Sequence, residues 1–536
     1  MPGPNDTAAG PVTAAIREAA RRRTFAIISH PDAGKTTLTE KFLLYGGAVQ
    51  EAGAVKARGE RRRATSDWME LEQKRGISIT STVLQFPYRD HVLNLLDTPG
   101  HRDFSEDTYR VLAAADAAIM VLDVAKGVEA QTLKLFEVAR DRGIPVLTFV
   151  NKYDRPGRAP LELLDEVEQQ IGLIPTPVTW PVGIPGDFRG VLDRRAGTFV
   201  RFTRSARGAT EAAEHVMTAD EAAASEGAAW EAALEELSLL EAVGADYEPE
   251  SFLGGISTPV FFGSALTNFG VRLLLDAVLD LAPPPSPRED ESGKPRPLDA
   301  PFSGFVFKVQ ANMDPAHRDR IAFFRVCSGR FERGMVVTHD PTGKPFATKY
   351  AHSVFGQERE TIDEGWPGDV IGLVNATDVR VGDSLWADEK VTYPSIPSFA
   401  PEHFAVVRAR DAGRFKQFRK GVAQLDEEGV VQVLRDRDLG DQAPMLAAVG
   451  PMQFEVAVHR LENEFGAPVE LSPTAYKVAR RTDEASAPAL RAMSGVRVLD
   501  RSDGALLALF ESPYWLARVE SEQPELTLQR LVAEGG

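Results

Sequence analysis

Two kinds of apolar pattern alternate through the first half of the chain. Short apolar runs such as "TFAIIS", "VLNLLD", "AAIMVLDV" and "PVLTFV" have the length and composition of buried strands. Between them, "KTTLTEKFLL", "FSEDTYRVLAAAD" and "TLKLFEVARDRG" repeat apolar positions at helical spacing. This alternation predicts an α/β domain with a mostly parallel sheet, because parallel strands need crossover helices. We assign it to residues 1–285, where "TPVFFGSA" and "GVRLLLDAVLDLAP" supply the last strand and helix.

The pattern changes after this first domain. "FSGFVFKVQ", "RIAFFRVCSGRF" and "GMVVTHD" are short β-rich runs separated by turn residues, which predicts an antiparallel β-barrel over residues 300–392. Residues 400–536 mix strand-like runs with the helical "PMQFEVAVHRLENEFG" and predict an α+β domain, although the pattern is weak beyond about residue 480. Proline-rich breaks at Leu281–Pro297 and Thr392–Phe404 are expected to be linkers between the three domains.

Composition indicates a globular protein of a reducing compartment. The 536 residues suffice for three or so domains, and the single cysteine, Cys327, excludes a disulfide within the chain. No apolar run has the character of a signal peptide or a membrane span, so we expect a cytoplasmic protein with no membrane contact.

The charge is unevenly distributed. Of a net charge of −17, residues 211–250 supply twelve Asp or Glu and no Lys or Arg, and their Ala, Glu and Leu predict an acidic helical insert near residues 205–250. This negative total argues against non-specific coating of nucleic acid. Basic runs at Arg21–Arg23, Lys56–Arg63 and Arg408–Lys420 are expected to be solvated faces, although a large RNA touched at a few places is compatible with the total.

The segment "SHPDAGKTT" has the strand–loop–helix context of a phosphate-binding loop, although Ser29 stands where the usual pattern begins with Gly. The following helix aims free backbone N–H groups at the loop and makes it an anion site. We expect Lys35 to bridge the β- and γ-phosphates and the Thr36 hydroxyl to bind Mg²⁺. The side chain of His30 has no evident chemical task and is expected either to pack or to support the residues that bind the nucleotide. The nucleotide-binding residues predicted here are Ser29, His30, Pro31, Asp32, Ala33, Gly34, Lys35, Thr36 and Thr37.

Three further motifs follow apolar strands. In "DTPG", a carboxylate can hold Mg²⁺ through water and the last amide can sense a γ-phosphate. In "NKYD", the Asp can accept from the ring N–H and the exocyclic amine of guanine, which adenine does not present together. "GSAL" supplies a backbone amide for guanine O6. Open α/β sheets bind ligands at the carboxyl ends of their strands, so we predict one site that also includes Asp97, Thr98, Pro99, Gly100, Asn151, Lys152, Asp154, Ser264, Ala265 and Leu266.

A hydroxyl-bearing segment, "RGISIT", lies between the phosphate loop and "DTPG". A hydroxyl there would join Mg²⁺ only while the γ-phosphate is present, so the segment would order with GTP and relax after hydrolysis. Ser78 is our candidate for this metal ligand, and a strand edge with exposed hydroxyls is the alternative.

Taken together, these motifs resemble those of the translational GTPases. Within that group, "SHPDAGKTT", "TSDWMELEQKRGISIT", "DTPGHRDFSEDTYR", "GFVFKVQANMDPAHRDR" and "QLDEEGVVQV" are similar to the bacterial peptide-chain release factor three family, from about Arg22 to about Glu470. Ser at the first loop position is ordinary in that family. The resemblance implies a P-loop GTPase domain, a β-barrel and an α+β domain. It also implies a GTP-bound factor that displaces the stop-codon-reading release factor from the ribosome after peptide release.

The resemblance extends to residues and partners. His101, directly after "DTPG", stands where the superfamily orients the attacking water, and it is the predicted catalytic residue. The implied cofactors are GTP or GDP and Mg²⁺, with Thr36 and Ser78 as metal ligands. No arginine finger is evident, so we expect slow hydrolysis until the ribosome docks. The implied partners of a monomeric chain are ribosomal RNA, ribosomal proteins and the codon-reading release factor.

Three alternatives are weighed against this function. A translocating elongation factor shares the GTPase motifs, but that family carries roughly two more domains than the remaining residues could form. A guanine-nucleotide switch without hydrolysis is opposed by His101, and a P-loop ATPase is opposed by "NKYD".

Overall fold

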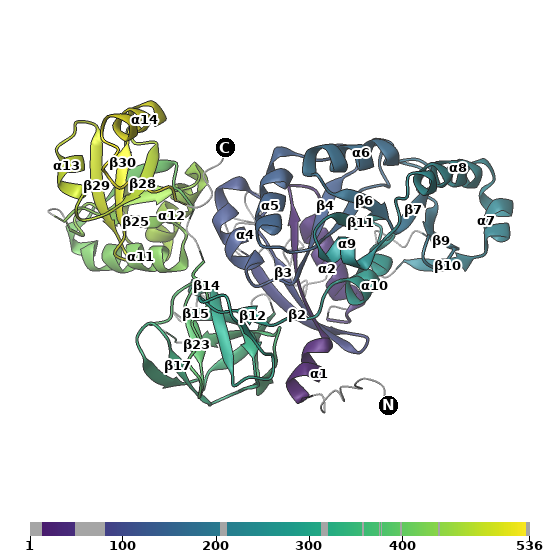
Figure 1. The fold of residues 1–536 in the computed structure, drawn as a ribbon, viewed down its shortest axis with the longest axis horizontal. Coiled ribbons are helices and arrows are strands. Elements are labelled where there is room, and N and C mark those ends of the chain that lie inside the picture. Colours follow the sequence, from purple (N-terminus) through teal and green to yellow (C-terminus); the bar gives the residue numbers. More distant parts are fainter. Residues whose placement is uncertain are drawn as a thin grey trace, which may run out of the picture.

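The computed structural model describes residues 13–48, 81–203, 212–311, 320–355, 358–374, 376, 378–396, 399–437 and 440–531. An α/β domain, an antiparallel β domain and an α+β domain follow one another along the chain, and Figure 1 shows them as three lobes in mutual contact. The predicted fold class is therefore confirmed.

The first domain is built on a seven-stranded sheet of order β2-β3-β1-β4-β5-β11-β6. The pair β2–β3 is antiparallel and the other pairs are parallel. One face packs on α2 and α10, and the other on α4, α5 and α6. The elements of this layer are α1 (Ala14–Ala20), β1 (Arg22–Ser29), α2 (Lys35–Tyr45), β2 (Thr82–Tyr88), β3 (His91–Asp97), η1 (Arg102–Phe104), α4 (Ser105–Leu112), β4 (Ala117–Asp123), α5 (Ala130–Asp141), β5 (Val146–Asn151), α6 (Pro160–Ile171), β6 (Ile174–Pro177), β11 (Ser257–Phe262) and α10 (Val271–Leu281).

An insert between β6 and β11 forms a second small sheet, at the end of the first domain that lies away from the other two lobes (Figure 1). It contains β7 (Thr179–Val182), β8 (Gly190–Asp193), β9 (Thr198–Thr203), β10 (Ala213–Met217), α7 (Ala219–Glu226), α8 (Ala228–Ala242) and α9 (Pro249–Leu253). The acidic segment thus holds helices α7 and α8 but begins with a strand. The partner of that strand, β9, lies outside the segment, so the local pattern gives no sign of the pairing.

The second domain is an eight-stranded antiparallel sheet of order β18-β17-β23-β14-β15-β22-β19-β20, rolled around its own apolar core. The long pair β14–β15 runs through its centre and carries a register shift between Val306 and Lys308. The strands are β14 (Ser303–Ala311), β15 (Arg320–Ser328), β17 (Val336–His339), β18 (Lys344–Ala347), β19 (Ala351–Phe355), β20 (Glu358–Thr361), β22 (Val370–Val374) and β23 (Ser384–Trp386), with the short pair β16 (Phe331–Glu332) and β21 (Glu364–Gly365) beside them.

The third domain packs helices on an antiparallel sheet of order β27-β24-β26-β25-β29-β30-β28. Residues beyond 480, where the sequence pattern is weak, complete one strand of this sheet and form two more, together with α13 and α14. The elements are β24 (His403–Ala409), η3 (Ala412–Arg414), α11 (Phe415–Glu428), β25 (Gln432–Arg435), β26 (Met445–Ala448), α12 (Pro451–Asn463), β27 (Val469–Pro473), β28 (Val478–Thr482), α13 (Ala487–Arg491), β29 (Val496–Arg501), β30 (Leu506–Phe510) and α14 (Pro513–Glu522).

The first and second domains share one apolar core. Phe305, Phe323 and Tyr393 belong to the same buried cluster as residues of β4 and α5. Arg325 of β15 donates to both carboxylate oxygens of Asp116, at 2.6 and 2.7 Å, across this interface.

The first proline-rich linker also lies against this interface. It forms the short strands β12 (Arg288–Glu289) and β13 (Pro295–Arg296). The guanidinium of Arg288 lies 4.0 Å from the ring centroid of Phe305 and donates to the carbonyl of Ala113 at 2.9 Å. This linker is therefore packed, rather than a tether with nothing to bury.

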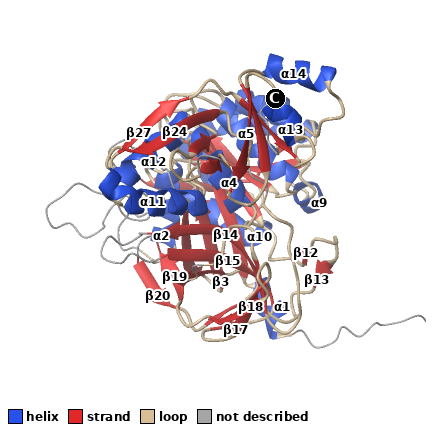
Figure 2. Ribbon diagram, turned by 90° about the vertical axis from the view of Figure 1, so that its left-hand side faces the viewer, coloured by secondary structure: helices blue, strands red, loops and turns tan. Residues whose placement is uncertain are grey.

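A contact between η1 of the first domain and α12 of the third, here called the η1–α12 contact, joins the outer lobes. The carboxylate of Asp103 accepts a hydrogen bond of 2.8 Å from the backbone N–H of Met452, in the first turn of α12. Phe104 packs on Val456, and Figure 2 shows α11 and α12 beside α4. Gly450 leaves space for this approach, because a Cβ there would lie 2.0 Å from Cγ of Asp103.

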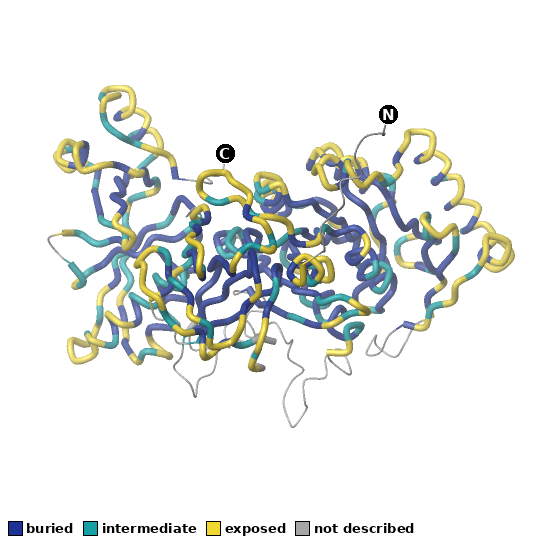
Figure 3. The backbone as a smooth tube through the Cα atoms, turned by 60° about the horizontal axis from the view of Figure 1, so that its bottom comes forward, coloured by how far each residue is buried: buried dark blue, intermediate teal, exposed yellow. Residues whose placement is uncertain are grey.

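Buried strands fill the interior of each lobe, and exposed turns and helix faces surround them (Figure 3). Among the described residues, no helix combines the length and the apolar character needed to cross a membrane.

Candidate functional site

The carboxyl ends of five neighbouring parallel strands, β3, β1, β4, β5 and β11, meet at one edge of the first sheet. The register brings predicted residues to this edge, since Asp97 pairs with Ile27, and Asn151 pairs with Asp123. Segments far apart in sequence therefore meet at one edge of the sheet, where open α/β sheets bind ligands.

The phosphate loop needs glycine at position 34 for two independent reasons. The φ angle of Gly34 is +99°, which side chains rarely adopt, and a Cβ would lie 2.3 Å from Nδ2 of Asn151. Helix α2 begins at the next residue, Lys35, so its free N–H groups point into the loop. The loop also bends at Asp32, an exposed residue with φ +66°.

Lys35 and Asp97 form a buried ion pair across the floor of the site. Nζ of Lys35 lies 2.5 Å from Oδ1 of Asp97, and the two side chains are 6% and 3% exposed. Lys35 is predicted to bind the phosphates and Asp97 to hold the metal ion, but in this structure the two side chains neutralise each other.

Asn151 ties the phosphate loop to the loop after β11. Its Nδ2 donates to the carbonyl of Ala33 at 2.7 Å, and its Oδ1 accepts from the N–H of Ala265 at 2.8 Å. Both bonds are buried, so Asn151 fixes the spacing of the two loops. The amide of Ala265 is engaged here, and to donate to guanine O6 it would have to exchange this partner.

Asp123, at the end of β4, is a site residue that the sequence analysis did not select. Its carboxylate accepts from Nζ of Lys152 at 2.8 Å and from the N–H of Ala125 at 2.9 Å, and Lys152 also donates to the carbonyl of Asp32. Burial pushes the pKa of Asp123 upward, but these hydrogen bonds outweigh it and hold the pKa below its ordinary value. The sequence signal for this residue is that Asp123 ends the apolar run "AAIMVLD".

One carboxylate oxygen of Asp154 lacks a hydrogen-bond donor among the described residues. This oxygen, Oδ1, is buried. A buried carboxylate oxygen without a donor is costly, and a ligand that carries N–H groups would relieve that cost. The orphaned oxygen therefore fits the N–H donors of a guanine base.

The "DTPG" segment lies against the phosphate loop. The hydroxyl of Thr98 donates to the carbonyl of Ile27 at 2.6 Å, and the carbonyl of Pro99 accepts from Thr108 at 3.3 Å. Gly100 lies so close to Pro31 that a Cβ would touch its backbone at 3.6 Å.

His101 follows Gly100 on the outer side of this segment. Its side chain is 28% exposed, and its Nδ1 accepts from the N–H of Asp103 at 3.3 Å. Since Asp103 also accepts the N–H of Met452, two hydrogen bonds through Asp103 connect the predicted catalytic residue to the third domain.

The first two loop residues are engaged with neighbouring groups of the protein. The hydroxyl of Ser29 donates to the carbonyl of His30 at 3.0 Å, and the ring of His30 lies 2.6 Å from Oε2 of Glu129. Burial lowers the pKa of His30 below its ordinary value, although Glu129 opposes the shift.

The remaining predicted residues have varied surroundings. Thr36 and Thr37 lie in the first turn of α2. Ser264 exchanges two backbone hydrogen bonds with Phe269, and Leu266 is 48% exposed. Ser78 lies outside the described residues. In the part of the chain that the structure describes, no group of three or more His, Cys, Asp or Glu could hold a metal ion by itself.

Three family models match the chain in succession. The elongation factor Tu GTP binding domain matches residues 20–284, and elongation factor G domain 2 matches residues 301–388. The C-terminal domain of class II release factor RF3 matches residues 393–520.

Full-length relatives are similar over almost the whole chain. A Synechocystis sp. protein named peptide chain release factor 3 is 52% identical over 523 residues, which cover 96% of this chain and 95% of that one. A protein of the same name from Microcystis aeruginosa is 51% identical and covers 96% of both chains. A crystal structure of a Thermus thermophilus protein has a similar fold, with a TM-score of 0.68 and 24% identity over 91% of this chain and 72% of that one.

Proposed function

This chain belongs to the peptide chain release factor 3 family, and from that premise we propose that it hydrolyses GTP on the ribosome and thereby promotes departure of the stop-codon-reading release factor after peptide release. Membership of the family makes it a translational GTPase of termination that binds guanine nucleotides. The ribosome dependence, the displaced partner and the residue roles below are our proposals.

The double bridge of Asn151 supports the proposed nucleotide site most directly. One side chain holds the phosphate loop through Ala33 and the base-side loop through Ala265. Phosphates would bind to the amides before α2 and to Lys35, and guanine would donate to the orphaned oxygen of Asp154. A ligand with both a phosphate chain and a guanine base would satisfy both loops together.

The residues near the phosphates also fit Mg²⁺. This ion is usually held by one or two protein oxygens together with substrate phosphates and water, rather than by a cage of carboxylates. Thr36 would be a direct ligand, Ser78 a second one, and Asp97 would act through water once Lys35 releases it. The bound ion would neutralise charge that develops on the phosphates.

His101 would orient the water that attacks the γ-phosphate. Because that phosphate can take the proton itself, positioning the water is most of the catalytic task. An arginine finger or an equivalent trigger accelerates GTP hydrolysis by about 10³- to 10⁵-fold. We therefore expect slow turnover by the isolated protein, and we propose that ribosomal RNA brings His101 toward the γ-phosphate.

The test uses post-termination ribosomes that carry a fluorescently labelled codon-reading release factor. Adding the protein with GTP should accelerate departure of the label, whereas GDP should not. His101→Ala should abolish ribosome-stimulated turnover and keep nucleotide affinity, and His215→Ala, an exposed residue of β10, serves as the control. Equal turnover with and without ribosomes would contradict the ribosome dependence. Stimulated turnover without release of the label would leave a translational GTPase with a different step.

A further inference from the structure

A strip of positive charge on the third domain, Arg408–Lys420, takes no part in the nucleotide site. It contains six Lys or Arg and one acidic residue, Asp411, in a chain whose net charge is −17. These cations come from the end of β24, from η3 and from the first two turns of α11, and all of them are exposed: Arg408, Arg410, Arg414, Lys416, Arg419 and Lys420.

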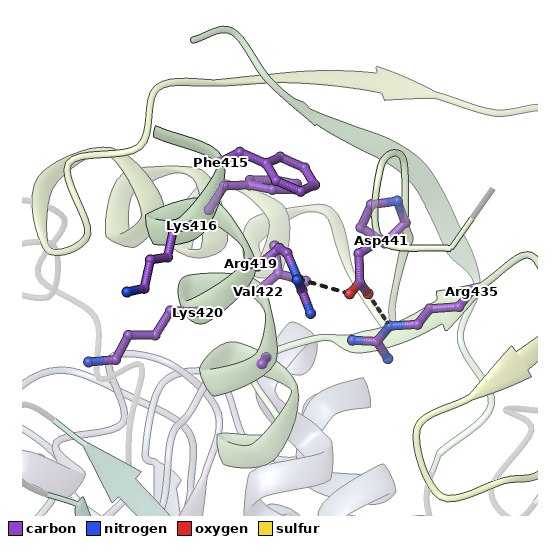
Figure 4. Close-up of a pocket in the computed structure, with 10 residues that line it drawn as sticks. Phe415, Lys416, Arg419, Lys420, Val422, Arg435 and Asp441 are labelled. Atoms are coloured by element: carbon purple, nitrogen blue, oxygen red, sulfur yellow. Dashed lines mark hydrogen bonds and ion pairs between the residues drawn. The ribbon is translucent and has the colours of Figure 1, made fainter. Parts of the chain in front are cut away.

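Helix packing fixes which side of α11 faces solvent. Phe418, Val422 and Leu425 are buried at helical spacing. Lys416 and Lys420 stand one turn apart on the exposed side, and Figure 4 shows their ammonium groups extending in the same direction. The strip is thus a fixed surface of a helix rather than a loose tail.

Little of this charge is neutralised by the protein itself. Arg419 binds Asp441 at 3.0 Å, but Asp441 also binds Arg435 at 2.8 Å, so one carboxylate serves two guanidinium groups. The carboxylate of Asp411 accepts the N–H of Gly413 within η3. Glu470 stands opposite Arg408 in the register of strand β27. Apart from Arg419, the cations of the strip form no ion pair with any residue that the structure describes: Arg408, Arg410, Arg414, Lys416 and Lys420.

An aromatic ring lies at the edge of the same surface. Phe415 is half-buried and stacks on Phe418, with ring centroids 5.9 Å apart and planes at 29°. Both rings line an open hollow of about 450 Å³ together with Lys416, Arg419 and Arg435 (Figure 4). Cations beside an aromatic ring are the combination that binds single-stranded nucleic acid, through phosphates and a stacked base.

We propose that the strip binds the phosphate backbone of RNA, with Phe415 against an unpaired base. The proposal rests on the proposed function for the source of that RNA, which is the ribosome. RNA suits the surface better than an acidic protein, because unpaired ammonium groups bind phosphate as point charges and the ring adds a contact that bases use.

The test compares two triple variants of the full chain. Arg414→Ala/Lys416→Ala/Lys420→Ala removes three cations of the strip, and Lys344→Ala/Lys349→Ala/Arg491→Ala removes three exposed, unpaired cations elsewhere among the described residues. Binding to ribosomes and to a fluorescent 20-nucleotide oligouridylate is measured from 50 to 200 mM KCl, by sedimentation and by anisotropy. Circular dichroism and GDP affinity should be the same for all three proteins.

Losing three phosphate contacts should lower the slope of log K against log salt by about 2 to 3. On counterion release alone, affinity near 0.15 M salt would fall on the order of 50- to 150-fold. The control variant should keep the slope of the unmodified protein. Equal slopes for the two triple variants, or no binding of the unmodified protein to either probe, would overturn the proposal.

A photo-crosslinker at Phe415 then identifies what the surface contacts on the ribosome. An adduct that ribonuclease removes supports RNA, and an adduct to a ribosomal protein overturns it. If the unmodified protein binds oligouridylate but not ribosomes, the proposed function fails while the RNA-binding strip stands.

Discussion

Replacing Gly450 by Ala should weaken the η1–α12 contact from a position in the third domain. The new Cβ would lie 2.0 Å from Cγ of Asp103, so the carboxylate has to move. Gly450 has φ −145°, an extended conformation open to any residue, and the substitution therefore adds no backbone strain at its own position. The whole effect should pass through Asp103, which lies on the loop of His101.

The expected free-energy change follows from the hydrogen bond between Asp103 and Met452 that the substitution removes. The carboxylate of Asp103, 2% exposed, accepts the N–H of Met452 at the start of α12. A hydrogen bond to a charged group is worth about 1.5–3 kcal/mol, and loss of a helix cap costs about 0.5–2 kcal/mol. We expect a loss of about 2 kcal/mol, or roughly 30-fold in the opening equilibrium of the contact. Asp103→Ala removes the same bond and should cost a similar amount.

A double-mutant cycle read by hydrogen exchange tests this reasoning. The protection of the Met452 amide, measured by mass spectrometry of the peptide that begins α12, should fall about 30-fold in each single variant. The double variant should lose about 2 kcal/mol, rather than about 4 kcal/mol, because the second change has nothing left to break. Additive losses would refute the claim that Gly450 acts through Asp103.

Three further predictions concern the nucleotide site. Asn151→Ala leaves the carbonyl of Ala33 and the N–H of Ala265 buried without their partner, at a cost of about 1–3 kcal/mol each. The GDP dissociation constant should therefore rise at least about 30-fold in a fluorescent-GDP titration, which corresponds to the lower sum of about 2 kcal/mol. Asn463→Ala, at an exposed position, should leave it unchanged. Asp154→Asn replaces an acceptor by a donor, so competition assays should show at least about 100-fold weaker GTP and stronger xanthosine triphosphate, and unchanged base preference would contradict the role of Asp154. Burial lowers the pKa of His30, so this residue stays neutral in the fold while the unfolded chain takes up a proton below about pH 6.5. Its contribution to stability should be complete above about pH 7 and decline as the pH falls through 6.5, and His30→Gln should show a flatter thermal midpoint between pH 5.5 and 7.5, whereas parallel curves would exclude this titration.

Features that depend on neighbouring residues could be predicted from the sequence. Strand β1, the glycine of the phosphate loop and helix α2 follow within about twenty residues, and the spacing of apolar and glycine positions carries all three. The gathering of "DTPG", "NKYD" and "GSAL" at one sheet edge followed from parallel topology alone.

Features that depend on distant partners could not be predicted from the sequence. Asp103 and Met452 lie 349 positions apart, and nothing in "GHRDF" indicates that its Asp caps a helix of another domain. In the sequence, Asp123 cannot be told from the last residue of any buried strand, because its contact with Lys152 depends on the fold. Strands β29 and β30 contain short, mixed sequences that take their identity from pairing with β25 and β28.

The ion pair between Lys35 and Asp97 has a consequence for the order of events at the site. Each of these buried side chains is the other's charged partner, so a bare anion that drew Lys35 away would leave the carboxylate of Asp97 buried with no counter-charge. On the proposed roles, a nucleotide that arrives with Mg²⁺ would supply a negative partner for Lys35 and a positive one for Asp97 in the same step. Binding would thus replace the partners of Lys35 and Asp97 at the same time, and neither charge would be left unpaired. The pair would admit a phosphate with its own cation in preference to one that comes alone.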